Sequence, residues 1–183
     1  MTLNGRLYYP QVLIISGSGK HVGKTTLACT IINKLSLNNN VVALKISSHF
    51  HPVNYDQPVY ELKDQFSIYE ERSSIPAEDS SKMKKAGASK VYYIQSTRDN
   101  IGKAFLKSME YIKPHWPVVC ESLGLLDFIR PGLSIIVKKA DKYLVKSTID
   151  PESIELINDG DFFKNFISKI SYNSGQWRLN QFN

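Results

Sequence analysis

The chain has 183 residues, 42% hydrophobic and 22% charged, with a formal net charge of +6. This length suits one domain with a sizeable core, and the apolar content argues against overall disorder. No apolar run is long enough to span a bilayer, and residues 1–9 lack the apolar stretch of a signal peptide. Cys29 and Cys120 fall in an expected helix and an expected strand, as free thiols of a reducing compartment would. We therefore expect a cytoplasmic protein without a membrane segment.

The positive charge allows three interpretations. The lysines are spread along the chain, which favours an ordinary solvated basic surface. A basic surface would also attract polyanionic ligands such as nucleotides. The sequence does not favour nucleic acid as a partner, because no arginine-rich patch is interleaved with aromatic residues.

The first predicted elements are a strand at residues 12–15 and a helix at 25–35, joined by a glycine-rich loop that ends in Gly-Lys-Thr-Thr. This order is typical of a P-loop. Glycines let consecutive N–H groups converge on a phosphate, and the helix N-terminus adds partial positive charge. Lys24 would reach the terminal phosphates, and the Thr25 hydroxyl would ligate Mg²⁺. The expected nucleotide-binding residues are Gly17, Ser18, Gly19, Lys20, His21, Val22, Gly23, Lys24, Thr25 and Thr26.

The second strand, at residues 41–46, is almost entirely apolar, as expected for a strand covered on both faces. Lys45 stands at its carboxyl end, where ligands bind in open α/β sheets, and would add positive charge to the phosphate site. The alternative is a lysine that only extends from the strand into solvent.

A long loop is expected at residues 47–65, and such loops are usually functional or mobile. Within it, Asp56 is a candidate magnesium ligand. His49 and His51 would share a face in extended backbone, but no cysteine or carboxylate at ligand spacing lies nearby, so polar loop contacts are favoured over metal binding.

The middle of the chain predicts a short strand at 66–70, a helix at 78–86 closed by Gly87, a strand at 90–95 and a helix at 100–112. Asp79 and Ser80 suit a helix N-cap. Alternatively, they face the nucleotide or a second anionic ligand.

A buried strand at residues 117–120 delivers Glu121 at its carboxyl end. Beside a P-loop such an acid would hold Mg²⁺, directly or through water, whereas the plainer alternative is a cap on the following turn. A strand at 133–138 leads into Lys138-Lys139-Ala140-Asp141, which is similar to the guanine-reading motif of G proteins. Asp141 would accept hydrogen bonds from guanine, although a charged strand exit explains the run equally well.

The last forty residues predict short helices at 151–157 and 161–170 and a final strand at 177–179. The alternation of strands and helices predicts one three-layer α/β domain with a mainly parallel sheet. Together with the loop, it predicts a single P-loop NTPase domain over residues 1–183.

Several of these segments resemble the MobB family, the molybdopterin-guanine dinucleotide biosynthesis adapters of the SIMIBI class of P-loop proteins. They are the loop at 17–26, Lys45 followed by His49, Asp79-Ser80 followed by Ala86-Gly87-Ala88, and Val119-Cys120-Glu121. The resemblance spans about residues 11–125 and leaves residues 127–183 without a counterpart, with 141–183 as a family-atypical C-terminal segment. Ser122 stands where the family has glycine.

The resemblance implies a homodimer that binds GTP with Mg²⁺, hydrolyses it slowly and assists the enzyme that attaches GMP to molybdopterin. By the resemblance, Gly23, Lys24 and Thr25 would hold the phosphates and Mg²⁺, with Glu121 at the metal. With the candidates argued above added, the expected catalytic residues are Lys24, Lys45 and Glu121, and the expected metal ligands are Thr25, Glu121 and Asp56. Gly17 and the run from Val22 to Thr25 also resemble the loop of dethiobiotin synthetases, which implies an ATP-dependent synthetase instead. A nucleotide-gated interaction module with negligible turnover is the third alternative.

Overall fold

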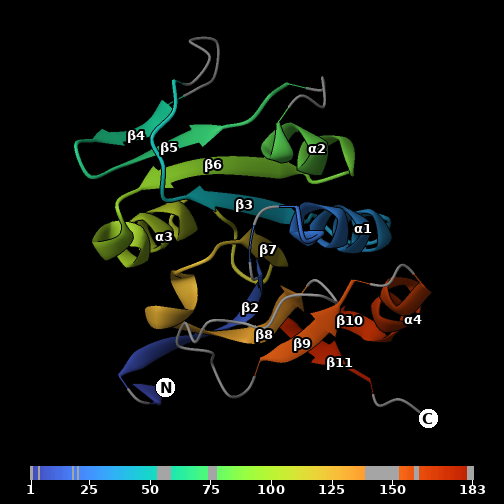
Figure 1. The fold of residues 1–183 in the computed structure, drawn as a ribbon. Helices are drawn as coiled ribbons and strands as arrows, with labels where there is room; N and C mark the ends of the chain where they lie inside the picture. Colours follow the sequence, from blue (N-terminus) through green and yellow to red (C-terminus); the bar gives the residue numbers. More distant parts are fainter. Residues whose placement is uncertain are drawn as a thin grey trace.

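The structure, a computed structural model, describes residues 2–3, 5–17, 19, 21–52, 59–73, 78–138, 153–158 and 161–180. Its main element is a mixed sheet flanked by helices (Figure 1). In spatial order the strands are β4 (Val59–Lys63), β5 (Phe66–Glu70), β6 (Lys90–Ser96), β3 (Val42–Ser47), β7 (Val118–Glu121), β2 (Arg6–Gly17), β8 (Ile129–Lys138) and β9 (Ile154–Ile157), and β1 (Thr2–Leu3) pairs with β2. In this spatial order, the six strands β6, β3, β7, β2, β8 and β9 run parallel to one another. Strand β5 is antiparallel to both its neighbours, β4 and β6.

Helices cover both faces of this sheet (Figure 1). One face packs against α1 (Lys24–Ser36), α2 (Asp79–Lys85) and α4 (Asp161–Lys169), and the other against α3 (Ile101–Met109). In β2, Leu13 and Ile15 belong to the first core, and Val12 and Ile14 to the second. Because side chains alternate along a strand, a run that is apolar throughout must be covered on both sides.

The last part of the chain is a hairpin of β10 (Ile170–Asn173) and β11 (Gln176–Leu179), which packs on the α1 face. The Trp177 indole N–H donates to the carbonyl of Gln11 at 2.8 Å, which attaches the hairpin to β2. From α1, the Lys34 ammonium donates to the carbonyls of Ile167, Ser168 and Ile170 at 2.8, 3.1 and 2.7 Å. The last carbonyl groups of a helix have no hydrogen-bond donor within the helix, and Lys34 supplies one at the C-terminal end of α4.

The predicted α/β class and the mainly parallel sheet are confirmed. The helices expected at 25–35, 78–86 and 161–170 are α1, α2 and α4, and Gly87 follows α2 with a φ of 106°, as its position after the helix requires. The described part of the chain contains no helix that is both long and apolar enough to cross a membrane. Cys120 is buried and Cys29 partly so, both as free thiols.

Three predictions about elements were wrong. Residues 154–157 form strand β9, not a helix, because Leu156 is buried between exposed neighbours and β8 offers a free edge for parallel pairing. The loop expected at 47–65 contains strand β4, whose Tyr60 ring packs on Tyr92 and Tyr111 at centroid distances of 5.2 and 4.9 Å. The helix expected at 100–112 is present as α3, and only its end was wrong, because the helix stops at Met109. Whether a short segment forms a helix or a strand depends on its partners elsewhere in the chain, and local periodicity carries no information about them.

Candidate functional site

The glycine-rich loop connects β2 to α1 at the carboxyl edge of the sheet. Gly23 precedes α1 and has a φ of 106°, a backbone conformation that residues with a Cβ rarely adopt. Val22 is buried, and its carbonyl accepts a hydrogen bond at 3.0 Å from the Asn158 side chain, which follows β9. These contacts hold the end of the loop next to α1, while Ser18 and Lys20 lie outside the described residues.

Gly17 and Gly19 differ in the space around them. A Cβ on Gly17 would lie 2.7 Å from the carbonyl oxygen of Val137 and 2.8 Å from a methyl group of Val22. A Cβ on Gly19 would meet no atom within 4 Å. Gly17 is therefore needed for the close approach of the loop to β8, and Gly19 leaves the loop open on its outer side.

Strand register brings three carboxyl ends together beside this loop. Glu121 of β7 pairs with Ile15 of β2 on one side and with Lys45 of β3 on the other. The chain leaves β2 through α1, on one face of the sheet, and leaves β7 toward Leu125 and Leu126, in the core of the other face. A crevice where neighbouring strands connect to opposite faces is where ligands bind in open α/β sheets.

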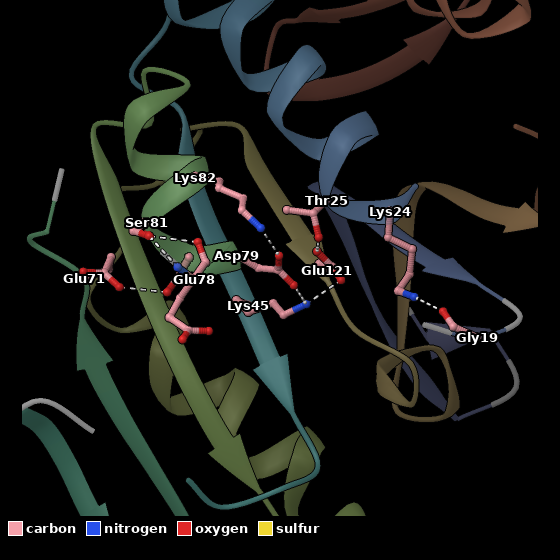
Figure 2. A network of polar contacts seen from close by, with 11 residues as sticks. Gly19, Lys24, Thr25, Lys45, Glu71, Glu78, Asp79, Ser81, Lys82 and Glu121 are labelled. Carbon is pink, nitrogen blue, oxygen red and sulfur yellow. Dashed lines mark hydrogen bonds and ion pairs between the residues drawn. The ribbon is translucent and has the colours of Figure 1, made fainter. Parts of the chain in front are cut away.

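A chain of polar contacts joins the carboxyl ends of β3 and β7 to α1 and α2 (Figure 2). The Thr25 hydroxyl donates to Glu121 Oε2 at 2.9 Å, and the Lys45 ammonium donates to Glu121 Oε1 at 2.5 Å. Lys45 also contacts Asp79 Oδ2 at 3.2 Å, and the other Asp79 oxygen lies 3.2 Å from Lys82 Nζ. The network therefore joins β7, β3 and α2 through alternating charges and reaches α1 through the Thr25 hydroxyl.

Lys24 is directed along the loop and away from Glu121 (Figure 2). Its ammonium donates to the Gly19 carbonyl at 2.5 Å. Burial lowers the pKa of Lys24 below its ordinary value, with Glu121 acting in the opposite direction and Lys45 adding to the decrease. A partly desolvated ammonium with one carbonyl partner retains donors for an anionic ligand.

Opposite charges set the protonation states of Lys45 and Asp79. Burial acts to lower the pKa of Lys45, but attraction by Glu121 and Asp79, together with hydrogen bonds to both, holds it above the ordinary value. Burial likewise acts to raise the pKa of Asp79, whereas Lys45 and Lys82 bring it below the ordinary value. Both groups are therefore charged at neutral pH.

The position of Asp79 is set by the packing of α2. Glu78, and neither Asp79 nor Ser80, is the N-cap of this helix, and its N–H donates to Ser81 Oγ at 3.0 Å. The Ser80 hydroxyl donates to the buried carboxylate of Glu71 at 2.8 Å. The capping role expected for Asp79 and Ser80 is therefore wrong, because the helix begins one residue earlier and Asp79 is left to contact Lys45.

The other candidate residues are placed as follows. His21 and Thr26 are exposed on the loop and on the first turn of α1. His49 and His51 are exposed after β3 with ring centroids 6.2 Å apart, and over the described ranges no cluster of three or more His, Cys, Asp or Glu could hold a metal. The candidates Asp56 and Asp141 lie outside the described residues.

Two contacts that support the candidate site were not predicted from the sequence. Asn158 supports the loop from 136 positions away, and an asparagine after a short apolar run does not indicate such a partner. Glu71 directly follows the strand predicted at 66–70. Glu121 was selected because it is an acid at the end of a strand, and the same reasoning would have indicated Glu71.

The fold and site together define an α/β protein with a charged network at the carboxyl edge of a mainly parallel sheet. Comparison of the chain with models of protein families, with curated proteins and with solved structures gives no match.

Proposed function

We propose that this chain is a P-loop protein that binds a nucleoside triphosphate with Mg²⁺ and hydrolyses it slowly. The observation that carries the proposal is the hydrogen bond from Thr25, in the first turn of α1, to Glu121 at the end of β7. It brings the hydroxyl of the Gly-Lys-Thr run and a buried strand-end carboxylate to one place, where a P-loop protein needs both.

Phosphate binding would use the start of α1 and Lys24. The helix has 13 residues, so its N-terminal N–H groups and dipole favour an anion. The Lys24 ammonium, now bonded to the Gly19 carbonyl, would exchange that partner for phosphate oxygens, which are stronger acceptors.

Two residues at the carboxyl edge of the sheet fit Mg²⁺. Thr25 and Glu121 offer oxygen donors, and Mg²⁺ in nucleotide sites is held by one or two protein groups together with phosphates and water. Such an ion neutralises the charge that develops on the transferred phosphoryl group. Glu121 is 4% exposed, so its charge is little screened by solvent.

Slow turnover is expected for the chain on its own. Three lysines supply the positive charge at the site: Lys45 and Lys82 in the network, and Lys24 at the start of α1. In P-loop GTPases an arginine finger, often supplied by a partner, adds about 10³–10⁵-fold in rate. A partner that supplies such a group would convert slow into rapid hydrolysis.

The resemblance to the MobB family supports GTP as the nucleotide and an accessory role in molybdopterin guanine dinucleotide synthesis, as a homodimer with a molybdopterin-handling enzyme as partner. The contact of Lys45 with Glu121 also suits the ATP-dependent synthetase alternative, since the dethiobiotin-synthetase resemblance gives the same two residues a role in carboxylation. A clear preference for ATP would favour that alternative.

Calorimetric titration with Mg-GTP and Mg-ATP tests the proposal, using wild type, Lys24→Ala and the exposed control Lys85→Ala. Wild type and control should bind, whereas Lys24→Ala should lose about 1.5–3 kcal/mol, roughly 10- to 150-fold in affinity. In parallel, a nucleotide at about 100 times its dissociation constant should stabilise the wild type by about 2.7 kcal/mol. Equal affinity of wild type and Lys24→Ala contradicts the P-loop interpretation.

A further inference from the structure

The ammonium of Lys45 is shared between two carboxylates that belong to different elements. It lies 2.5 Å from Glu121 Oε1 and 3.2 Å from Asp79 Oδ2 (Figure 2). The Lys45 side chain is 18% exposed, Glu121 is 4% exposed and Asp79 is 39% exposed. The buried carboxylate is thus the one beside Thr25, and the more solvated one is carried by α2.

This arrangement creates a conflict at the magnesium site proposed above. Mg²⁺ and the Lys45 ammonium would both seek the Glu121 oxygens, and the two cations repel one another at short range. An ammonium that stayed on Glu121 would weaken the metal's hold on the carboxylate. An ammonium that left without another partner would be a partly buried charge without a counter-ion, which is costly.

Asp79 resolves this conflict because it is already in contact with Lys45 and is held in place independently of Glu121. Its helix is anchored by the Glu78–Ser81 hydrogen bond, by the Ser80–Glu71 hydrogen bond and by Met83, which is fully buried. Neither of the two hydrogen bonds involves the loop at residues 17–26.

We propose that Asp79 is a positioning residue for the metal site: it takes over the Lys45 ammonium when Mg-nucleotide engages Glu121, so that Lys45 does not compete with the metal. The proposal rests on the proposed function, because it needs a Mg-nucleotide at Thr25 and Glu121. It assigns Asp79 a role that acts through Lys45 and requires no contact with the nucleotide.

The test measures the magnesium dependence of nucleotide affinity, defined as the ratio of the dissociation constant of a fluorescent GTP or ATP analogue in EDTA to that in Mg²⁺. Asp79→Asn should lower this ratio by at least about fivefold, because Lys45 is then left with Glu121 alone. Its affinity in EDTA should stay within about twofold of wild type. Asp79→Glu should retain the wild-type ratio, and Lys85→Gln, which removes an exposed charge from the same helix, should leave it unchanged.

A second arm separates positioning from a merely structural effect. Lys45→Met should raise the magnesium dependence, since the competing cation is gone. Asp79→Asn added to Lys45→Met should then have no further effect on the ratio, because Asp79 acts through Lys45. This arm also remains informative if Asp79→Asn alone folds poorly.

The outcomes distinguish the two proposals. If the wild type binds nucleotide and Asp79→Asn has the same magnesium dependence of nucleotide affinity as the wild type, the role of Asp79 is overturned and the proposed function stands. An equal effect of Asp79→Asn with and without Lys45 also overturns it. Absence of any nucleotide binding by the wild type overturns both.

Discussion

The Thr25 hydroxyl donates a hydrogen bond to the Glu121 carboxylate at 2.9 Å, across 96 positions of sequence. It links the first turn of α1 to the end of β7, the strand that lies directly beside β2. In this arrangement the hydroxyl proton points at the carboxylate. A metal ion between the two groups would need the hydroxyl to turn and offer a lone pair instead.

Glu121→Gln should remove the magnesium dependence of nucleotide binding while leaving binding in EDTA largely intact, because the change keeps the shape of the side chain and deletes its charge. It should also lower the free energy of unfolding by about 1.5–3 kcal/mol, since Lys45 and Thr25 lose a charged acceptor. Nucleotide titrations with Mg²⁺ and with EDTA, and urea unfolding, measure the two effects.

The control for this variant is Glu110→Gln, whose carboxylate is 60% exposed in an ion pair with Lys107. It should change stability by less than about 1 kcal/mol, as exposed pairs contribute little. If the magnesium titration of Glu121→Gln matched that of wild type, Glu121 would have a structural role alone.

Gly17→Ala and Gly19→Ala form a matched pair within the loop. Gly17→Ala should cost about 1–3 kcal/mol, because the new methyl would overlap the Val137 carbonyl and Val22, one of them backbone that cannot easily move. Gly19→Ala meets only open space and should be close to neutral. Thermal or urea unfolding of the two variants gives the comparison, and equal stabilities would show that the loop does not approach β8 as described.

The protein should bind GTP more tightly than ATP. If Asp141 reads guanine, Asp141→Asn should narrow the ratio of GTP to ATP affinity by roughly tenfold, which corresponds to about 1.4 kcal/mol. Competition titrations of wild type and variant against one fluorescent nucleotide provide the measurement. A wild type that prefers ATP would contradict this prediction and support a synthetase.

The two thiols should be unreactive in the folded protein. Burial raises the pKa of Cys29 from its ordinary 9.0 to about 11, with Glu121 and Asp79 adding to the increase, and burial raises the pKa of Cys120 as well. Alkylation at about pH 8 should therefore be slow for both thiols in the native protein and fast in urea, because the thiolate is the nucleophile. Mass spectrometry of wild type and Cys29→Ser assigns the modified residue.

The raised pKa values of the thiols also affect the stability of the protein at alkaline pH. The folded state favours the protonated thiols, so their contribution is fully present below the unfolded pKa of 9.0 and is lost as the pH rises above it toward 11. Removing Cys29 should reduce this alkaline loss of stability. Native alkylation at the unfolded rate would show that the thiols are accessible.

Sequence alone was sufficient for the features that local chemistry dictates. The apolar run before Gly17 and the helix after Gly23 were predictable, because a strand covered on both faces and an amphipathic helix each have a characteristic pattern. Glu121 was predictable as a strand-end carboxylate for the same reason, and so was Lys45. The α/β class followed from the alternation of such segments.

Only the tertiary structure decided which of these groups meet and how the weakly patterned segments fold. Strand order places β7 between β3 and β2, which brings Lys45 and Thr25 to the two oxygens of Glu121. The start of α2 at Asp79 determines that this carboxylate shares Lys45, and the pairing of Leu156 beside β8 turns an expected helix into β9. These contacts join residues far apart in the chain, and neither periodicity nor motif spacing contains the strand order on which they depend.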